Sequence, residues 1–269
     1  MTTQPEAIRQ RPAEFVQSLE RGLAVIRAFS AAHPRMTLSE VARHTGMTRA
    51  TARRFLITLE ALGYVASDGN SFALRPRVLQ LGYAYLSSFS VAEIAQGHLE
   101  ALADQLHESC SASVLDGEDV VYIARSSTNR IMTIGLSVGT RLPAYCTSMG
   151  RVLLACLDEP ELERYLATAN LHVRTDRTIT DADRLRSEIS AVRSQGWSML
   201  DQELEEGVRS VAVGIHDDAG NVVAAINTSA HAARVTLDTL RTTFLPALRA
   251  CGRQIEQDLA GGHHGRARR

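Results

Sequence analysis

Residues 37–65 constrain the fold of this chain more than any other stretch, because their pattern predicts two short helices joined at a glycine. Ser39 is the candidate N-cap of the first helix. The apolar residues of this helix repeat at spacings of three and four and share an inward face: Leu38, Val41 and Ala42. Gly46 follows a short polar end, where the chain must leave the helix with a positive φ angle.

A second helix is predicted from its cap, Thr48, to about Leu62. Its buried stripe consists of apolar residues at helical spacing: Ala52, Phe55, Leu56 and Leu59. The polar and basic residues of its N-terminal half are the candidate DNA-binding residues: Thr48, Arg49, Thr51, Arg53 and Arg54. Arginine suits this role because its planar guanidinium binds guanine edges or phosphates through two hydrogen bonds. Adjacent helix positions differ by about 100°, so Arg53 and Arg54 cannot both face a groove squarely.

A β-hairpin is predicted directly after the second helix. The apolar runs at residues 64–66 and 72–74 flank Asp68-Gly69-Asn70, and an Asp-Gly pair in this position is a strong turn signal. Two helices around a glycine turn, followed by a hairpin, form the layout of a winged helix-turn-helix, whose second helix enters the major groove of DNA. The alternative for the arginines is a solvated helix face, and the complete motif favours DNA binding over it.

Length and composition predict one small and one larger domain. The chain has 269 residues, of which 45% are hydrophobic, as is ordinary for a globular protein with an ample core. No apolar run approaches the ~20 residues of a membrane span and residues 1–15 contain no signal-peptide core, so we expect a cytoplasmic protein with no membrane partner. The widely spaced cysteines form no CxxC pair and predict reduced core residues without metal or cofactor: Cys110, Cys146, Cys156 and Cys251.

The basic charge is concentrated where the helix-turn-helix lies. Residues 1–85 contain 11 arginines against 6 acidic residues, a net charge of +5, whereas the remainder has 18 against 24, a net charge of −6. This distribution fits a phosphate-facing module joined to an acidic one.

The chain divides into segments that we predict as follows: a disordered N-terminus at 1–14, a winged helix-turn-helix domain at 15–75, a pair of linker helices at 76–108, an effector-binding domain at 109–260 and a disordered tail at 261–269. The larger domain has a mixed pattern. Its predicted strands are residues 112–115, 120–124, 132–136, 197–201, 208–216 and 222–229, and its predicted helices are residues 148–156, 159–167, 182–195 and 237–259. Turn signals at residues 116–117 and 218–221 make two strand pairs antiparallel, which predicts an α+β domain.

Residues 15–260 resemble the IclR-type transcriptional regulators. The motifs that support this resemblance are residues 18–23, 38–46, 48–62, 142–155 and 207–212, with Gly150-Arg151 at a position where the family usually has Gly-Lys or Gly-Arg. Residues 141–155 resemble the branch of PcaR, PcaU and PobR, which controls catabolism of protocatechuate and 4-hydroxybenzoate through β-ketoadipate. The resemblance implies a ligand-responsive regulator of aromatic-acid catabolic genes, with another small-carboxylate pathway as the alternative.

The resemblance also implies partners and a ligand site. It implies a homodimer or homotetramer that binds palindromic double-stranded operator DNA, and a GAF-like domain that binds a small carboxylic acid. The effector-binding positions that carry over are Thr147, Ser148, Met149, Asp201, Ser210, Asn227 and Ser229. Many relatives have Gly-Ala where this chain has Ser148-Met149, and this departure affects the size and polarity of the expected pocket.

Elementary chemistry bears on several of these positions. Ser148 is expected at a helix N-terminus, where free N–H groups favour a carboxylate, although it could simply cap the helix. Met149 could pack in the core, and the polar residues near the last strand could hydrogen-bond at a strand end. Arg141 and Arg209 could neutralise a diacid such as β-ketoadipate, but a structural ion pair is the alternative and is favoured for Arg209.

Two other classes of function remain open at this point. An enzyme with an appended DNA-binding module would need a nucleophile or base, and the isolated cysteines and histidines lie in no catalytic motif. A constitutive architectural DNA binder would use the larger domain only for oligomerisation. We expect a regulator and no enzymatic activity.

Overall fold

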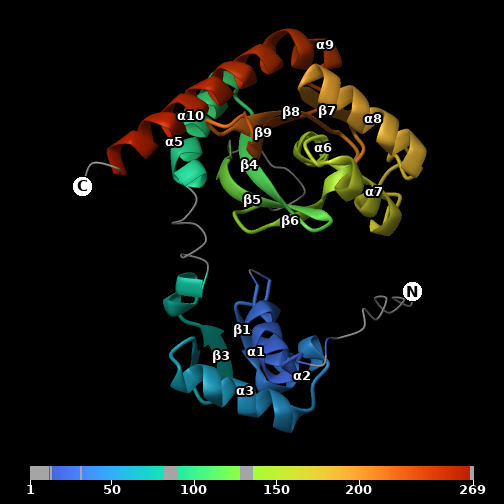
Figure 1. Ribbon diagram of the computed structural model, residues 1–269. Helices are drawn as coiled ribbons and strands as arrows, with labels where there is room; N and C mark the ends of the chain where they lie inside the picture. The colour runs from blue at the N-terminus through green and yellow to red at the C-terminus, as the bar shows by residue number, and fades with distance from the viewer. Residues whose placement is uncertain (1–11, 13, 31, 82–89, 128–135, 267–269) are drawn as a thin grey trace. The chain divides into compact units, whose positions relative to one another are not determined.

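The computed structural model describes residues 12, 14–30, 32–81, 90–127 and 136–266, and it separates into two compact units, Met1–Tyr85 and Leu86–Arg269 (Figure 1). The first unit is a winged helix-turn-helix and the second is an α+β domain, so the predicted fold class is confirmed. Most of the N-terminal segment predicted as disordered lies outside the described residues.

The first unit packs three helices against a small antiparallel sheet. Its elements are α1 (Gln17–Ala28), β1 (Arg35–Thr37), α2 (Leu38–Thr45), α3 (Arg49–Ala61), β2 (Val65–Ser67) and β3 (Ser71–Leu74), with strand order β1-β3-β2. Val25, Val41 and Leu56 are fully buried where the helices meet. The predicted stripe on α3 is correct at Ala52, Leu56 and Leu59, whereas Phe55 is only partly buried.

The start of α2 corrects the predicted cap. Thr37, rather than Ser39, is the N-cap: its hydroxyl accepts from the Glu40 amide at 3.4 Å, and the Glu40 carboxylate accepts from the Thr37 amide at 2.7 Å. Such a reciprocal capping box needs Glu or Gln three residues after the cap, and Thr37 meets this condition while Ser39 does not. Gly46 ends the helix with φ of 65°, as predicted.

The second unit is built on a six-stranded antiparallel sheet with strand order β6-β5-β4-β9-β8-β7. The strands are β4 (Ser109–Asp116), β5 (Asp119–Ser126), β6 (Arg141–Pro143), β7 (Trp197–Asp201), β8 (Val208–His216) and β9 (Val222–His231). The predicted hairpins β4–β5 and β8–β9 are present. The pairing of β4 with β9 joins them, so that residues 111 and 227 lie directly opposite each other.

The two faces of this sheet are covered by different helices (Figure 1). One face carries α5 (Ser90–Leu106) and α10 (Leu245–Arg266), with Leu99 and Leu248 fully buried against it. The other face carries α6 (Ser148–Leu154), with α7 (Glu159–Thr168) and α8 (Ala182–Gln195) packed around it. Short helical turns complete the unit: η2 (Ala144–Cys146), α9 (Leu237–Thr239) and η3 (Leu240–Phe244).

Some predicted boundaries differ from the structure. The short edge strand β6 was not predicted, and the predicted strand at residues 132–136 lies almost entirely outside the described residues. The predicted linker pair divides: η1 (Pro76–Val78) belongs to the first unit, whereas α5 packs onto the sheet of the second. The tail predicted as disordered is helical through Arg266. Buried residues such as Ile255 and Leu259 hold the preceding part of α10 in place, and each residue added to a formed helix gains one backbone hydrogen bond.

Two findings bear on partners and cofactors. Among the described residues, no helix combines the length and apolar composition needed to cross a membrane. Within the same residues, His, Cys, Asp and Glu side chains do not gather in groups of three or more that could hold a metal ion.

Gly150 sits where α6 packs most closely on the preceding turn η2. A Cβ atom at this position would overlap the backbone of Ala144 and the hydroxyl oxygen of Thr147. Since backbone atoms cannot yield as a flexible side chain does, only glycine permits this contact.

We predict that Gly150→Ala lowers the free energy of unfolding of the second unit by more than about 2 kcal/mol, measured by urea denaturation. The matched control is Gly97→Ala on α5, where an added Cβ meets nothing within 4 Å and should stabilise the helix by roughly 0.5–1 kcal/mol. Equal effects of the two substitutions would contradict the packing argument.

Candidate functional site

The N-terminal half of α3 presents a cluster of exposed cations. Arg49, Arg53 and Arg54 are exposed, and the structure shows no carboxylate within ion-pair distance of them among the described residues. Thr48 caps the helix by accepting from the Thr51 amide at 3.2 Å, and its hydroxyl also donates to that of Thr51 at 2.9 Å. The first turn contains no acidic residue, so the positive helix end and the arginines act together to attract phosphate.

The wing has its charges internally satisfied. Asp68 accepts from the amides of Ser71 at 2.7 Å and Asn70 at 3.0 Å, and it forms an ion pair with Arg35 at 2.9 Å. The hydrogen bonds from Ser71 lower the pKa of Asp68 to about 2. The Asp-Gly turn is therefore stabilised by its own hydrogen bonds, and Asp68 and Arg35 neutralise each other.

A small cavity lies in the second unit between the sheet, the start of α6 and the loop that joins β7 to β8. Its volume is about 30 Å³, which is room for about two water molecules. The polar residues that line it are Tyr122, Thr147, Ser148, Glu203, Glu205, Ser210, Asn227 and Ser229, and the apolar ones are Leu136, Cys146, Leu200, Leu204 and Val208.

Three polar atoms of this lining are buried without a hydrogen-bond partner among the described residues: Ser148 Oγ, Glu205 Oε2 and Asn227 Oδ1. Ser148 is only 1% exposed and Asn227 only 5%. The amide nitrogen of Asn227 donates to Ser229 Oγ at 3.1 Å, which leaves the other amide atom bare. Each unpaired buried polar atom costs about 1–3 kcal/mol, so three of them around one cavity indicate a site built for a polar ligand.

The structure brings together five of the eight predicted effector-binding residues. Thr147, Ser148, Ser210, Asn227 and Ser229 line the cavity. The predicted alternative that Ser148 caps α6 is wrong, because Thr147 is the cap and accepts from the Gly150 amide at 3.2 Å. Since α6 has only seven residues, its helix dipole adds little to the recognition of an anion.

The other three predicted residues lie outside this lining. Met149 is fully buried in the core, with its sulfur 3.3 Å from Ser113 Oγ, because it lies one position further around α6 than Ser148. Asp201 forms ion pairs with Arg177 and Arg209, which supports the structural role favoured for Arg209. Arg141 pairs at the surface with Asp116 and Asp119, so its guanidinium is already neutralised.

Sequence reasoning did not identify Glu203, Glu205 or Tyr122 as cavity residues. The two glutamates belong to the segment Glu203-Leu204-Glu205-Glu206, whose composition is typical of a solvated turn. Their position follows only from the fold, which turns this loop back over the sheet. Burial raises the pKa of Tyr122 to about 12 and that of Cys146 to about 11, so the phenol and the thiol are neutral near pH 7.

The loop over the cavity is held by a buried ion pair. Arg151 on α6 donates to Glu203 Oε2 at 2.5 Å, and the two side chains are 3% and 10% exposed. Arg151 also donates from Nε to the Tyr145 carbonyl at 3.0 Å. The pair therefore connects α6, the turn before it and the cavity loop.

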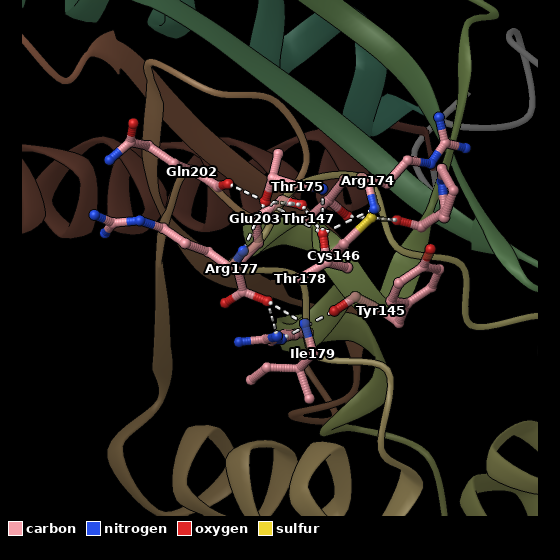
Figure 2. A network of polar contacts seen from close by, with 12 residues as sticks. Tyr145, Cys146, Thr147, Arg174, Thr175, Arg177, Thr178, Ile179, Gln202 and Glu203 are labelled. Carbon is pink, nitrogen blue, oxygen red and sulfur yellow. Dashed lines mark hydrogen bonds and ion pairs between the residues drawn. The ribbon is translucent and has the colours of Figure 1, made fainter.

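A short strap, residues 175–179, closes the same network (Figure 2). Thr175 Oγ1 donates to the Gln202 carbonyl at 2.7 Å, and Thr178 Oγ1 donates to the Glu203 carbonyl at 2.7 Å. The Ile179 amide donates to Glu203 Oε2 at 3.4 Å. The loop that places Glu203 and Glu205 in the cavity is thus held by Arg151 of α6 and by the hydroxyl groups of residues 175–179.

We predict that Arg151→Met or Glu203→Gln alone lowers the free energy of unfolding by about 3–5 kcal/mol, because each leaves a buried group without its partner. The double variant should lose less than the sum, as measured by a double-mutant cycle in urea. The exposed pair Arg186–Glu163 is the control, with an expected coupling below about 1 kcal/mol. Coupling of similar size in the two pairs would show that burial does not set their strength.

Comparison with known proteins matches both units of the chain. The IclR helix-turn-helix domain matches residues 18–69, and the C-terminal domain of IclR bacterial transcriptional regulators matches residues 83–257. The Pca regulon regulatory protein of Pseudomonas putida is 49% identical over 249 residues, which cover 92% of this chain and 86% of that protein.

Solved structures agree with this assignment. A crystal structure described as a candidate transcriptional regulator from Rhodococcus sp. RHA1 is 56% identical, with a TM-score of 0.82, and the match covers 92% of this chain and 99% of that one. The inducer-binding domain of a PobR double mutant from Acinetobacter, in complex with 3-hydroxybenzoic acid, is 33% identical with a TM-score of 0.58, over 61% of this chain and 96% of that one. The chain belongs to the IclR family of bacterial transcriptional regulators, and it is a DNA-binding regulator with a small-molecule effector domain rather than an enzyme.

Proposed function

We propose that this regulator controls genes of aromatic-acid catabolism, and that its effector is a small carboxylic acid of the protocatechuate, 4-hydroxybenzoate or β-ketoadipate type bound in the cavity beside α6. The observation that carries this proposal is the set of three buried polar atoms around one cavity, at Ser148, Glu205 and Asn227, that have no hydrogen-bond partner within the described part of the chain. Ser148 Oγ can donate to a ligand oxygen, whereas Glu205 Oε2 and Asn227 Oδ1 accept and need a donor such as a ligand hydroxyl group.

The relatives support the class of ligand. The Pseudomonas putida relative is named a regulator of the Pca regulon, and the Acinetobacter PobR domain was solved with 3-hydroxybenzoic acid. The apolar part of the lining, which includes Leu136, Leu200 and Leu204, suits the carbon skeleton of such an acid. Polar groups at few positions and apolar groups elsewhere are the usual composition of a small-molecule site.

The small volume of the cavity indicates how the ligand acts. Room for about two water molecules does not accommodate a benzoate ring, so binding requires the lining to move apart. An effector that binds only the opened form shifts the protein toward it by the difference in affinity between the two forms. We propose that this opening is the event that changes binding of the operator.

The DNA-facing part of the proposal rests on α3. Its exposed, unpaired arginines include Arg49 and Arg53, which are four residues apart and therefore share one side of the helix. We assign base or phosphate contacts to this side, with Arg54 toward its edge. A homodimer would place two copies of α3 on the half-sites of a palindromic operator.

We predict that Arg49→Ala or Arg53→Ala weakens operator binding by about 1–3 kcal/mol where the arginine contacts a base with two hydrogen bonds. Equal weakening on operator and unrelated DNA, with a salt slope reduced by about 1, would assign that arginine to phosphate instead. The measurement is fluorescence anisotropy on both DNA fragments at several salt concentrations. Arg184→Ala, an exposed arginine on α8, is the control; unchanged binding by both α3 variants would contradict the assignment.

We predict that Ser148→Ala reduces effector affinity by roughly 3- to 30-fold without lowering the unliganded melting temperature, because it removes a buried hydroxyl that has no hydrogen-bond partner among the residues described. Calorimetric titration with protocatechuate, 4-hydroxybenzoate and β-ketoadipate measures the affinity, and Ser187→Ala on the exposed surface of α8 is the control. A variant that loses stability but keeps its affinity would show that Ser148 has only a structural role.

The proposed function as a whole is tested by selecting genomic fragments with the purified protein, with and without each of the three acids. Enrichment of an inverted repeat beside aromatic-acid catabolic genes, altered by one acid, is the expected result. Enrichment beside unrelated genes would overturn the proposed pathway.

A further inference from the structure

A half-buried arginine lies beside the cavity on the same face of the sheet. Arg125, on β5, is opposite Ser111 on β4, and Ser111 is opposite Asn227 on β9. The side chains of Ser111 and Asn227 share the face that carries α6, because their neighbours Ala112 and Ile226 pack in the core under α5 and α10. The row therefore runs from Arg125 across one strand to the cavity residue Asn227.

The guanidinium of Arg125 points along this row. Its NH1 group donates to Ser111 Oγ at 3.1 Å, so it extends over β4 toward β9. Ser111 in turn lies directly opposite Asn227 on the next strand, and neighbouring strands are about 4.8 Å apart. The backbone of Arg125 is fixed separately, since its amide and carbonyl both bond to the side chain of Gln96 on α5, each at 3.3 Å.

Among the residues that the structure describes, Arg125 lacks the carboxylate partner that Arg151 and Arg209 have. Arg151 is buried and Arg209 is partly buried, and each forms an ion pair with an acidic side chain. The structure shows no such pair for Arg125 among the described residues, where its guanidinium donates only to a neutral hydroxyl. Burial accordingly lowers the pKa of Arg125, and the group remains charged near pH 7.

We propose that Arg125 binds the carboxylate of the effector, an assignment that rests on the proposed function. A ligand carboxylate above β4 and β9 would place a negative charge beside the Arg125 guanidinium, which otherwise donates to the neutral hydroxyl of Ser111. Its other oxygen atoms then reach Asn227, Ser148 and the loop beyond them. Arg125 thus binds the negatively charged group of the ligand, which is the role that the sequence suggested for Arg141.

The opposite side of the cavity sets the orientation of the ligand. Glu205 is in the loop between β7 and β8, and β4 and β9 lie between that loop and β5 in the sheet order. Its carboxylate oxygen, which has no partner in the described part of the chain, repels a second carboxylate and accepts a hydrogen bond from a hydroxyl group instead. The cavity is therefore positive toward Arg125 and negative toward Glu205, which favours one direction for a hydroxylated acid.

The test compares acids with their neutral amides. Purified full-length protein is titrated calorimetrically with protocatechuate, 4-hydroxybenzoate and β-ketoadipate, and each acid that binds is compared with its primary amide. Wild-type protein should prefer the acid by at least about 10-fold, as expected for a charge-assisted hydrogen bond. Arg125→Met should bind the acid at least about 10-fold more weakly and lose this preference, whereas Arg125→Lys should keep a reduced preference.

The controls distinguish the role of Arg125 from the proposed effector class. Arg141→Met removes a surface arginine that is already paired with Asp116 and Asp119, and it should leave acid affinity unchanged. Operator binding without ligand should be the same in every variant. An acid preference that persists in Arg125→Met, or its absence from wild-type protein, overturns the role of Arg125 alone. Failure of all three acids to bind wild-type protein overturns the proposed effector class and this inference with it.

Discussion

The buried pair Arg151–Glu203 is the interaction on which the effector domain's site depends. It joins the short helix α6 to the loop between β7 and β8, two segments more than fifty residues apart that both line one cavity. Desolvating two charges is costly, and such a pair is maintained only where the geometry is good and the remaining hydrogen bonds are satisfied. The Tyr145 carbonyl and the Ile179 amide satisfy them here, so the pair holds α6 and this loop together when no ligand is bound.

The distribution of charge separates residues that maintain the fold from residues available to ligands. Asp201, Arg141 and Asp68 all carry charges that are neutralised by nearby partners, and in each case the pair closes a turn or joins strands. The arginines of α3 and Arg125 have no such partner among the described residues. The exposed arginines of α3 can neutralise DNA phosphates, and the half-buried charge of Arg125 gains a counter-charge from an anionic ligand, so these positions are where binding of DNA and of such a ligand is expected.

Local patterns predicted the first unit well and the ligand site only in part. Gly46, Thr48 and the Asp-Gly turn act through neighbours within four residues, so their roles are legible in the sequence. The capping box at Thr37 was equally local and was misassigned to Ser39. By contrast, the partners of Arg141 and Asp201 depend on strand register, and the position of Glu205 depends on how a loop folds over the sheet. No pattern of spacing encodes these contacts, which is why Arg141 and Asp201 lie outside the cavity, whereas Met149 lies outside it because of its position on α6.

Arg125 is also bonded to α5, the first helix of the effector domain, and this contact bears on regulation. Gln96 of α5 holds the Arg125 backbone through two hydrogen bonds, so a ligand that draws the guanidinium toward β9 acts on a strand bonded to α5. Residues 82–89 connect this helix to the DNA-binding unit in the chain. To reverse a conformational preference from 1:99 to 99:1, an effector must favour one form by about 10⁴-fold, or about 5.5 kcal/mol. A single hydroxyl contact at Ser148 is too weak for that, whereas an ion pair formed in a sheltered site together with two or three satisfied polar atoms supplies an effect of the required size.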